Sequence, residues 1–112
     1  MIEEKIFEAL NEGVESVEGR VFPLYIPQNE QFPALVYTVV TDNIQKGLSC
    51  STHHYCRLQI DIYDNQFENV KKIEEVVKRV MDSFNLIEYS SQHEFDHESR
   101  VFRVILDMNF NY

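Results

Sequence analysis

The chain has 112 residues, enough for one domain that buries a modest core without disulfides or a structural metal. Hydrophobic residues make up 44% and charged residues 26%, and three Gly and three Pro leave no room for a low-complexity linker. The formal net charge of −9 disfavours proteins that grip nucleic acid or anionic membranes, because both need a basic surface. We expect a single domain over residues 1–112.

The N-terminal residues 2–17 predict an amphipathic helix. Apolar side chains recur there at helical spacing with Glu and Lys between them, and Gly19 follows where a helix would end. The segment lacks the basic and apolar regions of a signal peptide, and no run approaches the ~20 apolar residues of a membrane span. We therefore expect the protein to be made and to stay in a cytoplasm, with Cys50 and Cys56 as free thiols.

Extended segments follow this helix. Residues 20–25 are short and contain Pro23, which predicts an edge strand or an extended arm. Residues 34–41 are rich in β-branched and aromatic side chains and predict a strand. The polar residues 42–52 are interpreted as a mobile hairpin connection. Residues 53–64 then alternate between apolar and polar, which predicts a strand with one buried and one polar face.

Residues 67–84 give the clearest helical pattern, with apolar side chains on one face and mostly charged side chains on the other. Asp64 or Asn65 is expected to cap its N-terminus, and Glu68 to favour the positive end of the helix.

The C-terminal part predicts two more strands. One begins at 86–90, residues 91–99 form a charged, polar turn, and 102–110 alternate as a last strand. The predicted order is α-β-β-β-α-β-β, and strands joined by short polar segments should pair as antiparallel hairpins. We expect a two-layer α+β domain, with an antiparallel sheet of about four to five strands and two helices packed on one face.

Cysteine and histidine are the first candidates for chemistry. Cys50, His53, His54 and Cys56 lie within seven residues, and such side chains bind zinc, but the usual paired spacing of zinc modules is absent. Cys56 also continues the apolar series of its strand, so a buried structural cysteine is the favoured interpretation over a metal ligand. Nothing beyond residue type supports a Cys–His nucleophile.

His93 and His97 form a His-x₃-His pair, which binds metal when both lie on one helix face. They fall here in a predicted turn, so a solvent-exposed loop is favoured. The glycines stand alone and form no phosphate-binding loop. We expect no catalytic residues, no metal and no cofactor.

The chain has eight Phe and six Tyr. Core packing is the default for these rings. Four tyrosines could instead fall on the polar face of the sheet and serve a subunit interface: Tyr25, Tyr37, Tyr55 and Tyr63.

Several short motifs occur together in a recognisable order. They are GRVFP at 19–23, Ile26-Pro27-Gln28, FPALVY at 32–37 and LQIDIY at 58–63, followed by a helix. Over residues 2–84 this arrangement resembles the tail-completion, or head–tail joining, proteins of siphophages and related prophages, which are similar to tail-terminator proteins.

The resemblance implies a protein without catalysis. Such proteins form rings, commonly hexameric, that cap the tail tube and meet the head connector, with DNA passing through the ring unbound. They assemble in the host bacterial cytoplasm and become part of the virion. A net charge of −9 suggests an acidic channel wall that repels DNA.

The two polar segments 42–52 and 91–99 are the candidate docking loops. The residues singled out are Asn43, Gln45, Lys46, Gly47, Ser49, His93, Glu94, Asp96 and His97. Two alternatives remain beside the phage assembly protein. A protein-binding module outside a virion predicts a stable monomer with a different partner, and a small thiol- or metal-dependent enzyme predicts a depressed thiol pKa or a bound metal.

Overall fold

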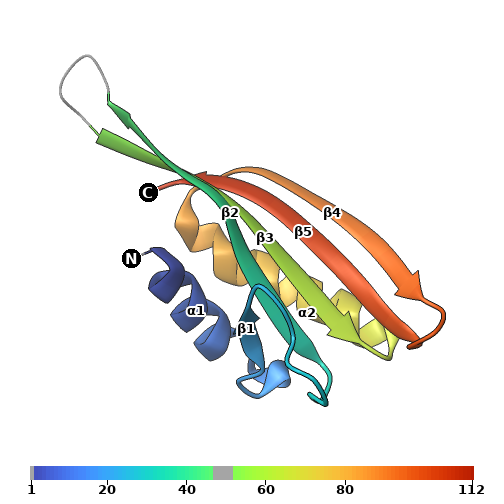
Figure 1. Ribbon diagram of the computed structural model, residues 1–112. Helices are drawn as coiled ribbons and strands as arrows, with labels where there is room; N and C mark the ends of the chain where they lie inside the picture. The colour runs from blue at the N-terminus through green and yellow to red at the C-terminus, as the bar shows by residue number, and fades with distance from the viewer. Residues whose placement is uncertain (1, 47–51) are drawn as a thin grey trace.

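The computed structural model describes residues 2–46 and 52–112, which form a five-stranded sheet with two helices across one face (Figure 1). Short 3₁₀ turns follow each helix, at Glu15–Val17 and Asp82–Phe84. The element order and the α+β class are those predicted from the sequence. The elements are α1 (Ile2–Gly13), β1 (Val21–Pro23), β2 (Ala34–Lys46), β3 (Thr52–Asp64), α2 (Phe67–Met81), β4 (Leu86–Asp96) and β5 (Val101–Asn111).

The strands lie in the order β1-β2-β3-β5-β4. The pairs β2–β3, β3–β5 and β4–β5 are antiparallel, as predicted. β1 instead pairs in parallel with β2, so the sheet is mixed and not wholly antiparallel. The chain does not turn back in a tight hairpin after β1. Residues 24–33 carry it back past the start of β1, where β2 begins in the same direction as β1.

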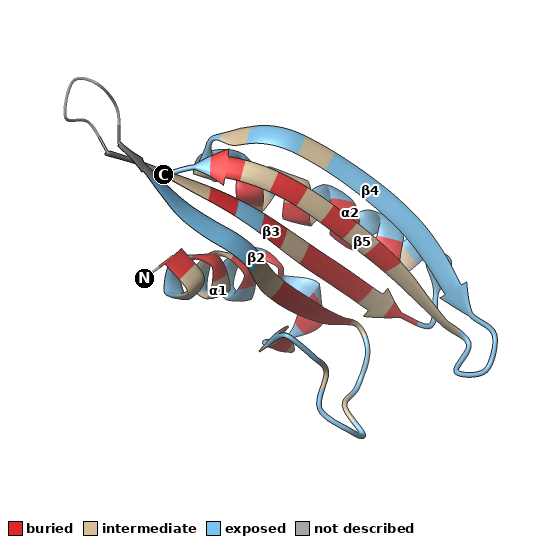
Figure 2. Ribbon diagram, turned by 45° about the horizontal axis from the view of Figure 1, so that its top comes forward, coloured by how far each residue is buried: buried red, intermediate tan, exposed pale blue. Residues whose placement is uncertain are grey.

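The core lies between the sheet and the helices (Figure 2). β3 and β5 turn alternate side chains toward α1 and α2, which confirms the predicted alternation. Helix α1 closely approaches α2, because a Cβ atom added at Gly13 would lie 2.5 Å from Cγ2 of Val80. The fully buried strand residues under the helices include Leu58, Ile60, Ile62, Leu106, Met108 and Phe110.

The predicted connection at 42–52 is largely strand. β2 continues to Lys46 and β3 begins at Thr52, so this prediction is wrong except for residues 47–51, which lie outside the described part of the chain. Residues 42–46 and 52–55, called the arm below, extend one end of a molecule that measures 52 × 23 × 23 Å (Figure 1). Pairing between the two strands lets these mostly polar residues adopt a strand.

The C-terminal residue ties the base of the arm to the rest of the sheet. The main chain of Tyr112 exchanges hydrogen bonds with that of His54, and its hydroxyl donates to the Asp42 carboxylate at 2.8 Å. The Tyr112 and His54 rings stack with centroids 4.7 Å apart. Burial and the Asp42 carboxylate raise the pKa of Tyr112 to about 12, so the hydroxyl keeps its proton as the donor.

The predicted turn at 91–99 is also too long. β4 continues to Asp96, and the turn comprises residues 97–100, with Arg100 in the left-handed region at φ 57°. β4 is an edge strand whose backbone pairs with β5 on one side, so its side chains need no apolar alternation to form a strand.

The predicted helix cap is wrong as well. Gln66, and not Asp64 or Asn65, occupies the N-cap position of α2, and no side chain there donates or accepts a capping hydrogen bond. Asp64 ends β3 and is buried. Glu68 lies in the first turn of α2, as expected.

Candidate functional site

The structure does not bring the two groups of predicted docking residues together. Asn43, Gln45 and Lys46 lie in the arm, as part of β2. Gly47 and Ser49 lie outside the described residues. The second group is at the other end of the sheet (Figure 1), where His93, Glu94 and Asp96 belong to β4 and His97 lies in the following turn.

The buried thiol of Cys56 is poorly suited to nucleophilic chemistry. Burial, with the Asp42 and Glu3 carboxylates, raises its pKa to about 12, and catalytic cysteines need a lowered pKa. Within residues 2–46 and 52–112, no three His, Cys, Asp or Glu side chains come together as metal ligands would. His93 and His97 have separate contacts, because His97 packs edge-on against Phe95 at 5.0 Å.

His93 contacts a buried carboxylate on α2. Its Nε2 lies 3.0 Å from Oε1 of Glu74, which is only 3% exposed, and the Tyr89 hydroxyl donates to the other Glu74 oxygen at 3.2 Å. Two lysines of α2, Lys71 and Lys78, lie 4.0 and 3.7 Å from the same carboxylate. This cluster ties the edge strand β4 to the helix layer.

Burial alone would raise the pKa of Glu74. The hydrogen bond from His93, the charge of Lys71 and the hydrogen bond from Tyr89 outweigh that effect, so the pKa lies below its ordinary value. The same neighbourhood raises the pKa of Tyr89, through burial and then the charge of Glu74. Glu74 is therefore ionised near neutral pH and accepts hydrogen bonds from β4.

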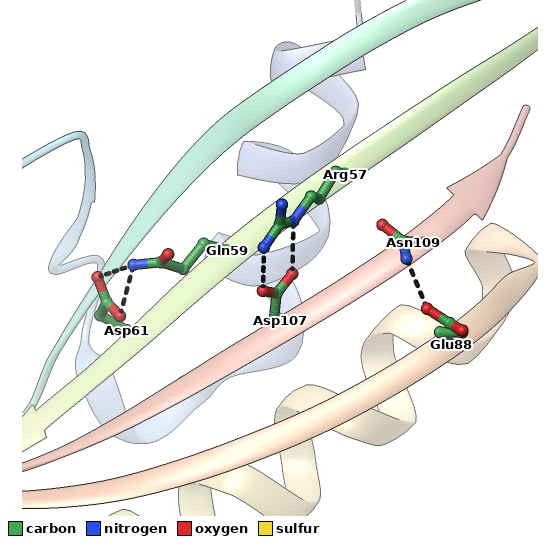
Figure 3. Close-up of polar contacts among 6 residues, drawn as sticks. All are labelled: Arg57, Gln59, Asp61, Glu88, Asp107 and Asn109. Carbon is green, nitrogen blue, oxygen red and sulfur yellow. Dashed lines mark hydrogen bonds and ion pairs between the residues drawn. The ribbon is translucent and has the colours of Figure 1, made fainter.

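The sheet face opposite the helices, called the polar face below, carries a row of paired charged and amide side chains (Figure 3). Arg57 makes two hydrogen bonds to the Asp107 carboxylate, at 3.2 and 2.7 Å. Farther along β3, the Gln59 amide donates to both oxygens of Asp61 at 3.2 Å. On β4 and β5, the Asn109 amide donates to Glu88 at 2.9 Å.

Asp61 is the deepest charge on this face, at 4% exposed. The Arg103 guanidinium lies 3.3 Å from Asp61 and 3.6 Å from Glu94, so Arg103 joins β3 to β4 across β5. Burial would lower the pKa of Arg103, but the Asp61 carboxylate keeps it raised. Sequence alternation places Asp61 and Arg103 on one face, but only the strand register shows that they meet.

Of the four tyrosines considered for the polar face, two lie there and two do not. Tyr55 and Tyr63 flank polar-face residues, and Tyr63 lies under the Arg103 guanidinium at 5.6 Å. Tyr37 is on the opposite face, buried and 6.3 Å from the Phe7 ring of α1, so the polar-face interpretation is wrong for it. Tyr25 belongs to no strand and is 70% exposed.

Segment 24–33 places apolar side chains against the polar face near the end of β4. Leu24 and Tyr25 are each 70% exposed, and Phe32 is partly exposed beside them. Leu24 has φ 70°, a conformation that costs a non-glycine residue roughly 1–2 kcal/mol. We call these three side chains the apolar patch. The sequence gives no periodic pattern for it, because 24–33 is neither helix nor strand.

No family profile and no curated protein matches the chain. Among solved structures, 30 chains match, and one of them belongs to the virion of a native gene transfer agent (GTA) particle. That chain superposes with a TM-score of 0.61 and 10% sequence identity, and the match covers 95% of this chain and 90% of the other. At this identity the comparison establishes a shared fold.

Across the two described ranges, 2–46 and 52–112, no helix combines the length and apolar composition needed to cross a membrane.

Proposed function

We propose that the chain is a non-enzymatic structural protein of a phage, a prophage or a phage-like particle. In this proposal it forms a ring, most simply a hexamer, that completes the tail and joins it to the head connector. The partners are copies of itself, the connector or neck protein and the tail-tube protein. It assembles in the host cytoplasm and remains in the virion at the junction.

The observation that carries the proposal is the fold shared, over nearly the whole of both chains, with a chain of the GTA particle virion. The order of the GRVFP, FPALVY and LQIDIY segments supports it independently, since it resembles the tail-completion proteins. The buried Cys56 thiol, with its raised pKa, argues against Cys56 as the nucleophile of the alternative thiol enzyme.

The surface is compatible with assembly. Among the described strands, both margins of the sheet lack a partner over much of their length, and the apolar patch exposes large side chains at one end of the molecule. The polar face carries more carboxylates than guanidinium groups, with Asp61, Glu88, Glu94 and Asp107 against Arg57 and Arg103. If this face lines the channel, like-charge repulsion keeps DNA from adhering as it passes.

Electron microscopy of particles made without the gene tests the proposal. We expect filled heads and separate tails, with joining restored by the wild-type gene supplied in trans. A tagged protein that retains function should locate at the head–tail junction, in a ring. Joined, infective particles in the absence of the gene would refute the assignment. A resolved ring with a neutral or basic inner wall would refute the acidic channel alone.

The rival hypothesis of a binding module outside a virion makes a different prediction. It expects a monomer that binds an unrelated partner and leaves particle assembly unchanged when deleted. The same deletion strain separates the two, because only the assembly protein leaves heads and tails unjoined.

A further inference from the structure

Two strands have outer edges without a partner strand in the described part of the chain. β4 pairs with β5 on one side only, and β1 covers β2 only along Leu35–Tyr37. Residues 38–46 of β2 therefore present backbone N–H and C=O groups at the opposite margin, as β4 does at its own (Figure 1). Such edges can bind another strand.

The strand directions make the two edges compatible. Within β2-β3-β5-β4 every neighbouring pair is antiparallel, so β4 runs opposite to β2. A second copy placed beside the first in the same orientation offers its β2 antiparallel to β4. Antiparallel pairs outnumber parallel ones and are slightly more stable per residue.

We propose that β4 of one copy pairs with residues 38–46 of β2 in the next copy, so that one sheet continues from copy to copy. The contact joins two different surfaces, and repeated contacts of this kind close a ring when the rotation allows. This inference rests on the self-assembly in the proposed function and names the interface that produces it.

Charge favours this pairing over β4 against β4. Residues 86–99 contain four carboxylates and no Lys or Arg, whereas residues 38–46 contain one carboxylate, Asp42, and one cation, Lys46. Two copies of β4 side by side would bring like charges together, which destabilises cross-strand pairs. The β2 margin of a second copy carries no net charge over residues 38–46, so it brings less repulsion to the acidic β4. The four carboxylates are Glu88, Glu94, Asp96 and Glu98.

β4 also lacks proline and lysine, two residues that often protect an edge strand. Residues 86–96 include no Pro and no Lys, and their register against β5 shifts only between Leu86 and Glu88. On β2 the register shifts between Val39 and Thr41, so the regular part of that edge begins at Thr41. Pairing is therefore expected to centre on residues 41–46 and on 88–96.

The two faces of the sheet give a sharp geometric test. Thr41 pairs with Arg57, and Ser90 with Asp107, so both side chains lie on the polar face. Ser91 pairs with the buried Leu106 and points to the helix side. In a continuous sheet, residues opposed across the junction share a face. Cysteines at 41 and 90 can then approach, whereas cysteines at 41 and 91 cannot.

Disulfide formation in mixtures of variants that each carry one introduced cysteine tests which residues approach each other across the junction. In a C50S background, T41C is mixed with E88C, S90C or Q92C. A mixture with S91C is the matched control, because residue 91 lies on the opposite face. Cys56 is fully buried in the wild-type fold, so it is not expected to form a cross-link. We expect a cross-linked dimer with at least one of the three polar-face partners, several-fold above the S91C mixture, and none from T41C alone. A dimer from S90C or Q92C alone would mean β4 against β4 and would overturn the proposal.

Two variants of opposite charge at the exposed Thr41, T41E and T41K, provide a second measurement. T41E adds a carboxylate facing the acidic β4 of the neighbour and should raise the concentration for half-assembly roughly tenfold relative to T41K. Sedimentation velocity and native mass spectrometry follow the assembly, and circular dichroism checks that both variants fold. Equal assembly of T41E and T41K would overturn the proposal.

The outcomes separate this inference from the proposed function. A wild-type ring with cross-links only outside these strands rejects the edge pairing and leaves the tail role intact. Cross-links between β2 and β4 in a protein whose deletion leaves particles joined reject the tail role and leave the pairing intact. A wild-type chain that stays monomeric at the highest attainable concentration, with no polar-face cross-link, rejects the pairing.

Discussion

The central strands of the sheet, β3 and β5, and the outer strand β4 share an extended backbone but differ in what surrounds their side chains. β5 buries every second side chain from Val104 to Phe110 under the helices, whereas β4 is exposed along most of its length (Figure 2). The central strands are held by burial. The strands at the margins are stabilised by pairing with the adjacent strand of the same chain and by a few polar contacts. Stability should therefore depend on the centre, and assembly on the margins.

The largest loss is expected in the centre. Leu106 is fully buried, and L106A should lower the free energy of unfolding by about 2–5 kcal/mol, since it removes apolar contacts and leaves a cavity. Ile87 on β4 is 54% exposed, and I87A should change the free energy of unfolding by no more than about 0.5 kcal/mol. Urea denaturation measures both. Similar losses in the two variants would contradict the contrast between centre and margin.

The next largest loss of stability is expected where α1 packs against α2. G13A places a methyl group against the stiff Val80 side chain, so it should destabilise by about 1–3 kcal/mol despite the better helix propensity of Ala. In the double variant G13A/V80A the Val80 methyl groups no longer block the new methyl group. Its loss of unfolding free energy, measured by urea denaturation, should therefore be smaller than the sum of the losses in G13A and V80A. Additive losses would show that α1 and α2 are not in close contact there.

The attachment of β4 to the helix layer comes third. E74A leaves the Tyr89 hydroxyl and the His93 ring without their shared acceptor, and should cost about 1–3 kcal/mol of unfolding free energy. The neighbouring Glu75 is exposed and lies 3.9 Å from Lys78, so E75A is the matched control and should be nearly neutral. Amide exchange should also accelerate along β4 in E74A alone.

The same carboxylate predicts a pH dependence. The folded pKa of Glu74 lies below its ordinary value of 4.5, so its stabilising contribution is complete above that value and is lost as the pH falls through the folded pKa. The groups facing it are Lys71, Lys78, Tyr89 and His93. The gap in stability between wild type and E74Q should therefore narrow as the pH is lowered below 4.5. A constant gap across this range would contradict the assignment.

The contrast between centre and margin also explains what the sequence could predict. β3, β5 and α2 were recognisable because the helix–sheet core imposes a regular apolar period on their residues. Residues 42–46 and 91–96 form strands through pairing alone, and their polar side chains resemble those of loops. The strand state of these residues depends on a partner elsewhere in the chain, which a local pattern does not reveal.

The start of β2 shows a different limit. Leu35 and Tyr37 face the helices, yet Ala34 and Val36 on the polar face are buried too, at the end where segment 24–33 lies beside Tyr63. Burial on both faces removes the alternation, so the face of Tyr37 could not be predicted. The Asp61–Arg103–Glu94 cluster was missed for a related reason, since it depends on the register of three strands.

The smallest stability effect is expected on the polar face. Arg57 and Asp107 form a two-bond ion pair, but it is exposed, so water and salt compete with it. D107N should lower the melting temperature slightly at low salt and not detectably at about 1 M NaCl, where screening extends to about 3 Å. R57K keeps the charge without the paired geometry and serves as the control. If D107N alters assembly while its folding matches the wild type at high salt, the pair matters for docking. A large loss of stability that persists at high salt would instead place the polar face of the central strands among the elements that hold the fold.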